Sequence, residues 1–395
     1  MSAAVTARAI YRRAAIYWLT ASLCLIVLNV LAAGVLFLWD PRADVEEPPY
    51  VEEALKRIYP DWSEEDRRAL RDENRRDFQP EAMVQFREKQ QTGRFSTLDE
   101  HGFRNGLQQG PWPPESDFFN IFVLGGSTAF GYGVPDEDTI PSQLQRLLGG
   151  VDLARPPRVY NFGRGAFYST MERILFDKLI TLGPKPDLVV FLHGLNEFYW
   201  PEDPPPLTVH WTKRVQEALA HPFRAAVGSL AIMRLIEAWR SRGAVATFGR
   251  DDLADQPPAV AQRKIDRVLE RYLGTKAAIE ARAAAANVPV VMVWQPVPTY
   301  GYDLRHHVFD GNFGPHELTR IGYPRMRERL RKDPAGENVL WCAEIQRGIT
   351  ELLYIDKVHY SPAMSARVAQ CIVEHLVERG LVPLHQTRSE NDATH

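Results

Sequence analysis

Residues 118–128 read Phe-Phe-Asn-Ile-Phe-Val-Leu-Gly-Gly-Ser-Thr, an apolar run that ends in two glycines and a serine. The apolar part has the length and composition of a strand buried on both faces, which is typical of a parallel sheet. Gly125 and Gly126 permit a sharp turn after this strand and leave space around the hydroxyl of Ser127. The stretch therefore predicts a serine presented at the carboxyl end of a buried strand. Taken alone, it fits a helix-capping serine equally well.

Further apolar runs and helical stretches alternate along the rest of the chain. This alternation predicts an α/β domain, with a parallel sheet covered by helices on both faces. Sites in such sheets form at the carboxyl ends of the strands. We expect further strands at 158–162, 186–192, 288–294 and 352–355, and helices at 139–148, 169–182, 261–287 and 365–379.

Polar motifs follow the expected strands. Residues 161–165 follow the second strand, 194–196 (Gly-Leu-Asn) the third, and Asp356 and His359 the last. Acyl transfer by a serine needs a histidine base, a carboxylate that orients it, and fixed donors for the oxyanion. The chain offers a candidate for each of these roles, although each motif alone fits an ordinary turn.

Taken in order, the four motifs resemble those of the SGNH hydrolase superfamily, also called GDSL-like. The match spans about residues 117–380. The resemblance implies a three-layer, flavodoxin-like fold and no metal or organic cofactor. It also implies that Ser127 is the nucleophile, His359 the general base and then acid, and Asp356 the orienting carboxylate.

The resemblance further implies an oxyanion hole made by the Ser127 N–H, the Asn196 side chain and a backbone N–H of the second motif. The family usually has glycine five positions after the motif's asparagine, where this chain has Ala166. We expect Gly165 to serve, with Gly163 and Ala166 as alternatives. The first motif also departs from the family, since it reads Gly-Gly-Ser-Thr rather than Gly-Asp-Ser-Leu.

The N-terminal segment predicts a membrane anchor. Residues Ala14 to Trp39 contain no charged side chain. A helix of this length measures about 39 Å, enough to cross a hydrocarbon core of roughly 30 Å. Arginines precede the run and acidic residues follow it, so the N-terminus is expected in the cytoplasm and the remainder outside, in the periplasm or extracellular space. The alternatives are a cleaved signal peptide and a buried soluble helix.

These expectations divide the chain into five parts. Proline-punctuated, charged sequence follows the anchor, and two insertions that leave from strand ends could cover the site. The expected parts are 1–13, a cytoplasmic N-terminus; 14–39, the transmembrane anchor; 40–116, a stalk or accessory segment; 117–380, the hydrolase domain with insertions 200–260 and 298–336; and 381–395, a tail.

Charge and cysteine content limit the expected partners. The formal net charge is −3 and no long basic run occurs, so nucleic acid is not expected as a partner. Cys342 and Cys371 could pair in an oxidising compartment or remain free. The spacing of the loop histidines matches no compact metal site, and we expect them to be solvated: His210, His306, His307 and His316. The sequence leaves the oligomeric state open.

Together the motifs and the anchor predict a membrane-bound esterase, deacetylase or O-acyltransferase. Its substrate would be an extracytoplasmic ester, of a carbohydrate or an envelope polymer. One alternative is a lipase or thioesterase, in which Phe223–Trp239 and the aromatic insertion 298–336 accept an acyl chain. Another is a non-catalytic scaffold or binding module in an envelope complex, suggested by the altered first and second motifs.

Overall fold

The computed structural model describes residues 2–38, 48–74, 78–199, 215–240, 258–332 and 338–385. The chain divides into two compact units. We call Met1–Glu47 with Pro204–Gly249 the helical unit, and Pro48–Asp203 with Arg250–His395 the sheet unit. The candidate catalytic residues all belong to the sheet unit.

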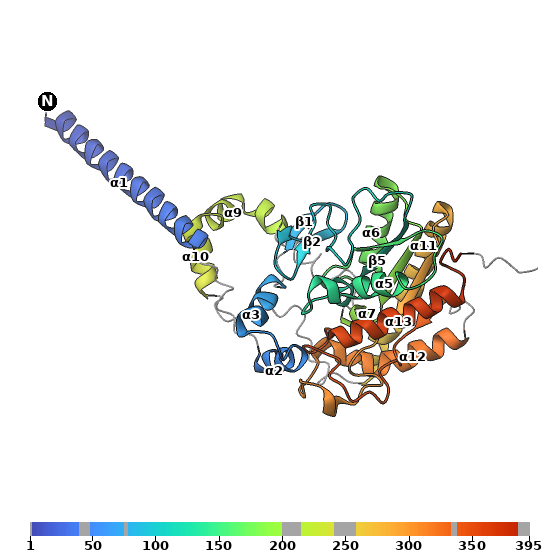
Figure 1. Cartoon of the computed structure of the whole chain (residues 1–395). Coiled ribbons are helices and arrows are strands. Elements are labelled where there is room, and N and C mark those ends of the chain that lie inside the picture. Colours follow the sequence, from blue (N-terminus) through green and yellow to red (C-terminus); the bar gives the residue numbers. More distant parts are fainter. Residues whose placement is uncertain are drawn as a thin grey trace, which may run out of the picture. The chain divides into compact units, whose positions relative to one another are not determined.

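A five-stranded parallel sheet forms the centre of the sheet unit (Figure 1). Its strand order, β6-β5-β7-β8-β9, is the order 2-1-3-4-5 of flavodoxin-like folds. The predicted α/β class is confirmed. The strands are β5 (Phe119–Gly125), β6 (Pro157–Asn161), β7 (Leu188–His193), β8 (Val290–Trp294) and β9 (Val339–Trp341).

Helices cover both faces of this sheet, because its strands are apolar on both sides. On one face, α5 (Ile140–Leu148) and α13 (Pro362–Glu378) lie side by side and pack on alternate strand residues such as Ile121 and Val123 (Figure 1). On the other face lie α6 (Ser169–Leu182), α7 (Leu195–Tyr199), α11 (Pro258–Ala286) and α12 (Thr319–Lys332), with α6 and α11 in contact. These layers place the carboxyl ends of β5, β7 and β8 at one edge of the sheet.

The last strand lies elsewhere than the sequence predicted. The expected strand 352–355 is a buried loop, and β9 supplies the fifth strand instead. The N–H of Ile355 donates to the carbonyl of His359 at 2.9 Å, so this apolar run folds back on itself. A short apolar run has the same pattern in a buried loop as in a strand, so periodicity alone does not separate the two.

The described part of segment 40–116 belongs to the sheet unit. Helix α2 (Pro49–Ile58) and helix α3 (Glu64–Glu73) pack their apolar faces against Val134 and Ile355. Ser63 caps α3, and its side chain accepts from the N–H of Asp66. Two small antiparallel pairs follow: β1 (Phe78–Glu81) with β2 (Gln85–Glu88), and β3 (Gln91–Thr92) with β4 (Thr97–Leu98). This segment is thus part of the domain's core rather than a separate stalk.

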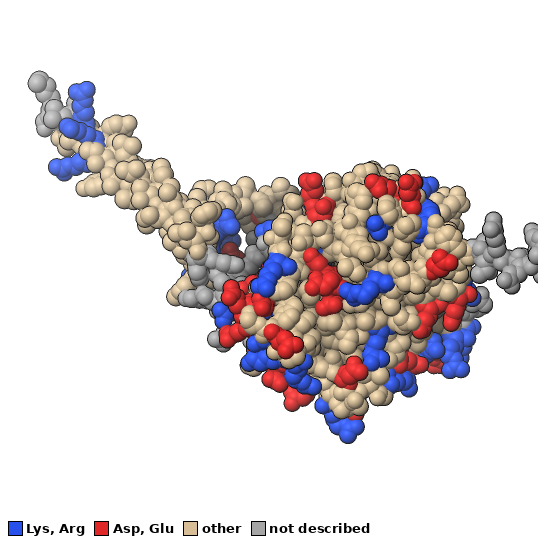
Figure 2. Space-filling model, viewed as in Figure 1, with Lys and Arg blue, Asp and Glu red and all other residues tan. Residues whose placement is uncertain are grey.

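The helical unit consists of α1 (Ser2–Leu38), α9 (Pro222–Gly228) and α10 (Ala231–Arg240). Residues Thr6–Leu38 have the length and apolar composition of a helix that could cross a membrane or act as a signal sequence. Figure 2 shows Lys and Arg side chains gathered at the N-terminal end of this helix, with an uncharged surface along the rest. The described part of insertion 200–260 between 215 and 240 belongs to this unit.

A disulfide joins Cys342, directly after β9, to Cys371 in α13. The two cysteines are 29 residues apart in the sequence. The sequence had left this pairing open. The chain between them carries both Asp356 and His359, so the bond closes the loop that holds two of the candidate catalytic residues.

Candidate active site

The structure brings Ser127, His359 and Asp356 into one chain of contacts. Ser127 begins the short helix α4 (Ser127–Phe130) at the end of β5. Its Oγ lies 2.8 Å from Nε2 of His359, and Nδ1 of His359 lies 2.5 Å from Oδ2 of Asp356. Both Ser127 and His359 are buried. This is the geometry of a serine hydrolase triad, in which a histidine takes the serine's proton and a carboxylate holds the ring.

The loop of Asp356 keeps its carboxylate ionised. Burial acts to raise the pKa of Asp356, but the adjacent His359 and two backbone N–H groups outweigh it and hold the pKa well below its usual range. Those N–H groups belong to Val358 and His359, and both donate to Oδ1, at 2.9 and 2.8 Å. The carboxylate therefore stays charged and able to support an imidazolium.

Close approach explains the glycine before Ser127. A side chain at Gly126 would overlap the amide nitrogen of Asn196. That amide donates to the carbonyl of Phe167 at 2.7 Å, which ties the third motif to the second. An asparagine amide has two N–H groups, so this bond uses one of them. Asn196 thus reaches the nucleophile's turn from the carboxyl end of β7.

Gly165 does not have the surroundings that the sequence analysis expected for an oxyanion donor. Its N–H donates to Oε1 of Glu88 at 2.5 Å. The next residue, Ala166, has a φ of 62°. This left-handed conformation is the one that glycine adopts most readily, which accounts for the family's glycine at this position. Ala166 therefore has the backbone conformation of the family's glycine, while the N–H of Gly165 is bonded to Glu88.

Gly163, the other alternative, has a structural role. Its N–H donates to Oδ1 of Asn161 at 3.0 Å. A side chain at Gly163 would overlap the backbone nitrogen of Phe130, so only glycine lets the second motif pass α4 this closely.

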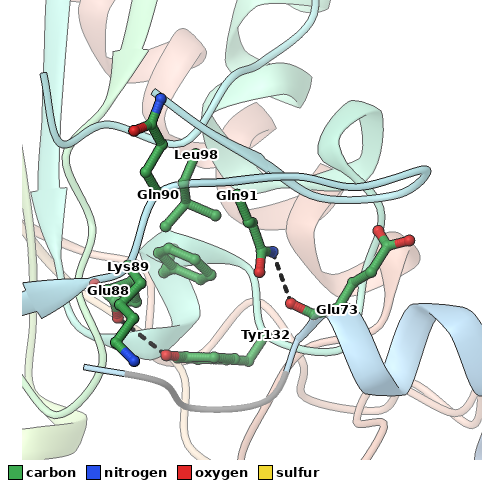
Figure 3. A pocket seen from close by; sticks show the side chains of 8 residues that line it. Glu73, Glu88, Lys89, Gln90, Gln91, Leu98 and Tyr132 are labelled. Atoms are coloured by element: carbon green, nitrogen blue, oxygen red, sulfur yellow. Dashed lines mark hydrogen bonds between the residues drawn. The ribbon is translucent and has the colours of Figure 1, made fainter. Parts of the chain in front are cut away.

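Glu88 was missed by the sequence analysis. It lies at the end of β2, is buried, and accepts from the Tyr132 hydroxyl at 3.0 Å as well as from Gly165 (Figure 3). Burial raises the pKa of Glu88. The ring of Tyr132 lies 5.7 Å from the ring of His359, centroid to centroid. The accessory segment thus contributes a carboxyl group that joins the second motif to the surroundings of the catalytic histidine.

A cavity of about 140 Å³ adjoins this contact (Figure 3). Its lining combines two aromatic rings with amide, ammonium and carboxyl side chains, which suits a hydroxylated ligand more than a hydrocarbon chain. The lining residues are Glu73, Glu88, Lys89, Gln90, Gln91, Leu98, Phe130 and Tyr132.

Gln295, directly after β8, was also missed. Its Oε1 accepts from the hydroxyl of Thr128 at 2.6 Å and from that of Tyr360 at 3.0 Å, and its Nε2 donates to the carbonyl of Leu192 at 3.3 Å. Thr128 directly follows Ser127 in the sequence, and Tyr360 directly follows His359. Gln295 therefore bonds to both loops. The distance between these loops determines the distance between Ser127 and His359.

The insertion 298–336 is largely packed into the sheet unit. Tyr302 and Phe313 are buried in two of its apolar clusters. His307, which we expected to be solvated, is buried, and this desolvation lowers its pKa to about 4. The expectation was wrong because His307 packs against the rings of Phe313 and Tyr354. His210 lies outside the described residues.

Comparison with known proteins gives matches at the level of fold. The sequence matches no protein-family model and no curated protein. Among solved structures, a member of the lipolytic protein G-D-S-L family from Veillonella parvula aligns with 65% of this chain and 98% of its own, at 10% identity and a TM-score of 0.36. A catalytic mutant of an acetylxylan esterase from Geobacillus stearothermophilus covers 68% and 97%, at 16% identity and a TM-score of 0.37.

A third match is a psychrotrophic esterase from Pseudoalteromonas sp., which covers 66% of this chain and 98% of its own, at 11% identity and a TM-score of 0.34. These likenesses concern the fold. The strand order and the placement of Ser127, Asn196, Asp356 and His359 come from the chain itself. On that basis the sheet unit is a parallel α/β fold with the flavodoxin-like strand order 2-1-3-4-5.

Proposed function

We propose that this protein is a serine esterase that acts through an acyl-enzyme. The observation that carries the proposal is the contact chain from Ser127 through His359 to Asp356. As Oγ of Ser127 bonds to the ester carbonyl carbon, its proton passes to Nε2 of His359. His359 then gives this proton to the departing alkoxide as the ester C–O bond breaks. Water, activated by the same histidine, releases the acid and restores Ser127.

The oxyanion formed in both steps needs donors near Oγ of Ser127. We assign this role to the N–H of Ser127, the side-chain amide of Asn196 and the N–H of Ala166. Asn196 supports the assignment because its amide lies against Gly126. Ala166 replaces Gly165, whose N–H is bonded to Glu88.

The proposed substrate is an ester with a small acyl group on a polar alcohol, such as an acetylated carbohydrate or envelope polymer. Support for this class comes from Glu88, Lys89 and Gln91, polar side chains that line the cavity beside Tyr132 together with apolar ones. Transfer to an alcohol in place of water would use the same acyl-enzyme. The lipase alternative has less support, since Phe223 is 81% exposed and belongs to the helical unit.

The proposed location is a membrane with the sheet unit outside the cytoplasm. Helix α1 supports the anchor by its length and apolar composition. The disulfide between Cys342 and Cys371 supports the compartment, because such bonds persist in oxidising surroundings.

Labelling with a fluorophosphonate tests the enzyme directly. Residues 41–395 should be labelled, and the Ser127→Ala and His359→Ala variants should not. Hydrolysis of p-nitrophenyl acetate and p-nitrophenyl octanoate then separates the acyl classes, and we expect the acetyl ester to be preferred. Labelling or ester turnover that survives in Ser127→Ala would refute the triad. A folded but unlabelled wild type would favour the scaffold alternative.

A further inference from the structure

Helix α10 packs against the apolar helix α1 within the helical unit. The half-buried side of α10 consists of Ala231, Ile232, Leu235 and Ala238, which recur at helical spacing. On α1, Asn29, Ala32 and Leu36 form the corresponding covered face, while the flanking residues are exposed. The two helices therefore meet along one face of each.

Asn29 provides a specific polar contact between them. Its Oδ1 accepts from the backbone N–H of Ile232 at 3.3 Å, and its Nδ2 donates to the carbonyl of Leu25 at 2.9 Å. Ile232 lies in the first turn of α10, where N–H groups lack partners within the helix. An asparagine in an apolar membrane span is costly unless it has a partner. The start of α10 supplies that partner.

The position of Asn29 along α1 sets the depth of α10. If the span begins at Ala14, a hydrocarbon core of roughly 30 Å ends about twenty residues later, near Ala33. Asn29 then lies about 6 Å below the outer boundary of the core. Amphipathic helices in the interface bury their apolar side about 5–10 Å deep, so α10 would lie at that level.

The exposed surface of α10 has two flanks that fit such a position. At about 100° per residue, Ile236 and Trp239 fall on one flank and Arg234 and Glu237 on the other. Trp239 is 67% exposed and Ile236 is 36% exposed. Tryptophan and arginine are the residues that membrane interfaces favour. The apolar flank is too exposed for a helix in water and suits contact with lipid.

An apolar groove of about 330 Å³ lies between α1 and Leu230, the residue directly before α10. Five of its six lining residues are apolar, and the sixth is Asn29. They are Leu25, Ile26, Asn29, Val30, Ala33 and Leu230. The groove has the chemistry to hold a hydrocarbon chain.

We propose that α10 lies in the outer interface of the membrane that α1 crosses, with its Ile236–Trp239 flank in the lipid and its Arg234–Glu237 flank toward the headgroups. Through α10, the insertion then makes a second membrane contact. This inference rests on the proposed anchor and is independent of the esterase activity. Phe223, in the neighbouring α9, is exposed as well.

Spin labelling of the full chain in phospholipid nanodiscs tests the proposal. Cys24→Ser removes the free thiol and keeps the disulfide. Nitroxide labels are then placed singly through Ile236→Cys, Arg234→Cys, Leu28→Cys and Leu182→Cys. Frequent collisions of the label with oxygen indicate that it lies in lipid. Frequent collisions with a water-soluble nickel chelate indicate that it lies in water. Leu28 reports on the span, and Leu182, which is 73% exposed on the sheet unit, is the aqueous control.

We expect labels at 236 and 28 to favour oxygen and labels at 234 and 182 to favour nickel. A label at 236 that matches 182, while 28 still favours oxygen, would overturn the proposal and leave the anchor intact. Water-like values at both 28 and 236 would overturn the anchor and this inference together. Equal values at 234 and 236 would also contradict it, because the two flanks would then share one environment.

Discussion

At the scale of single residues, we expect Gln295 to hold Ser127 and His359, the proposed nucleophile and base, at their distance. Its Oε1 holds the hydroxyls of Thr128 and Tyr360. Gln295→Leu should lower kcat for p-nitrophenyl acetate by roughly 10- to 100-fold, with a smaller change in KM, because small displacements of catalytic groups are costly. Steady-state kinetics of the folded variant measures this. Gln370→Leu on the exposed side of α13 is the matched control, and a kcat within twofold of wild type at Gln295→Leu would contradict the role.

The buried carboxyl group of Glu88 should make the stability of the folded protein depend on pH. Burial raises its pKa in the folded protein, so the folded state binds this proton more tightly than the unfolded chain. The resulting stability is present below the carboxyl's ordinary pKa and is lost as pH rises through the raised value. Glu88→Gln is neutral at every pH and retains an acceptor for Gly165. The Tm of Glu88→Gln minus the Tm of wild type should therefore increase as the pH rises from about 4 to about 8.

The companion variant Glu88→Ala distinguishes the effect of the Glu88 charge from that of its hydrogen bond with Gly165. It leaves the buried N–H of Gly165 without its acceptor, which costs about 1–3 kcal/mol. Denaturant unfolding should show this loss at both ends of the pH range. A Tm difference between Glu88→Gln and wild type that stays constant with pH would show that Glu88 does not titrate in the folded protein.

At the scale of elements, the disulfide restrains the loop that carries Asp356 and His359. It closes 29 residues, for which chain entropy gives roughly 3–4 kcal/mol. Replacing both Cys342 and Cys371 with serine should lower the free energy of unfolding by about this amount in urea. Fluorophosphonate labelling should fall at urea concentrations that wild type tolerates. Cys24→Ser is the control and should change neither property.

Four of the five strands of the sheet could be predicted from the sequence. Three of them are apolar runs followed by polar turns, whereas β6 has the mixed sequence Pro-Arg-Val-Tyr-Asn before its polar turn. Strand β9 could not, since Val339–Trp341 is short and its burial is only partial. The four motifs occur in a fixed order along the chain. This order made it possible to locate the triad and Asn196 from the sequence. Their contacts are now described, while their catalytic roles remain proposals.

The supports of the site could not be predicted, because they come from distant parts of the chain. Glu88 meets Gly165 across 77 residues, and Thr128 meets Gln295 across 167. Buried Arg104 likewise reaches from the accessory segment to the carbonyls of Gly131 and Val134, at 2.7 and 2.8 Å. The local sequence around Glu88, Gln295 and Arg104 does not indicate which loop each of these side chains will contact.

At the scale of the whole molecule, the positive charges in the N-terminal part of α1, before its uncharged run, predict the orientation of the helix. Arg8, Arg12 and Arg13 should keep the N-terminus in the cytoplasm. Alkaline phosphatase fused after Asp40 should be active, and a green fluorescent protein fused there by the Sec route should be dark. Replacing the three arginines with glutamate should reduce phosphatase activity. A fusion after Asp40 that remains in the cytoplasm would overturn the proposed topology.

The long separation between Ser127 and His359 has a consequence for biosynthesis. The two residues are 232 positions apart. At roughly 5–20 residues per second, a ribosome needs about 12 to 46 s to pass from one to the other. During that interval the growing chain carries a nucleophile without its base, and the disulfide around His359 cannot yet form. The enzyme is therefore made inert, and its activity begins only when the C-terminal part of the domain has joined the first strand.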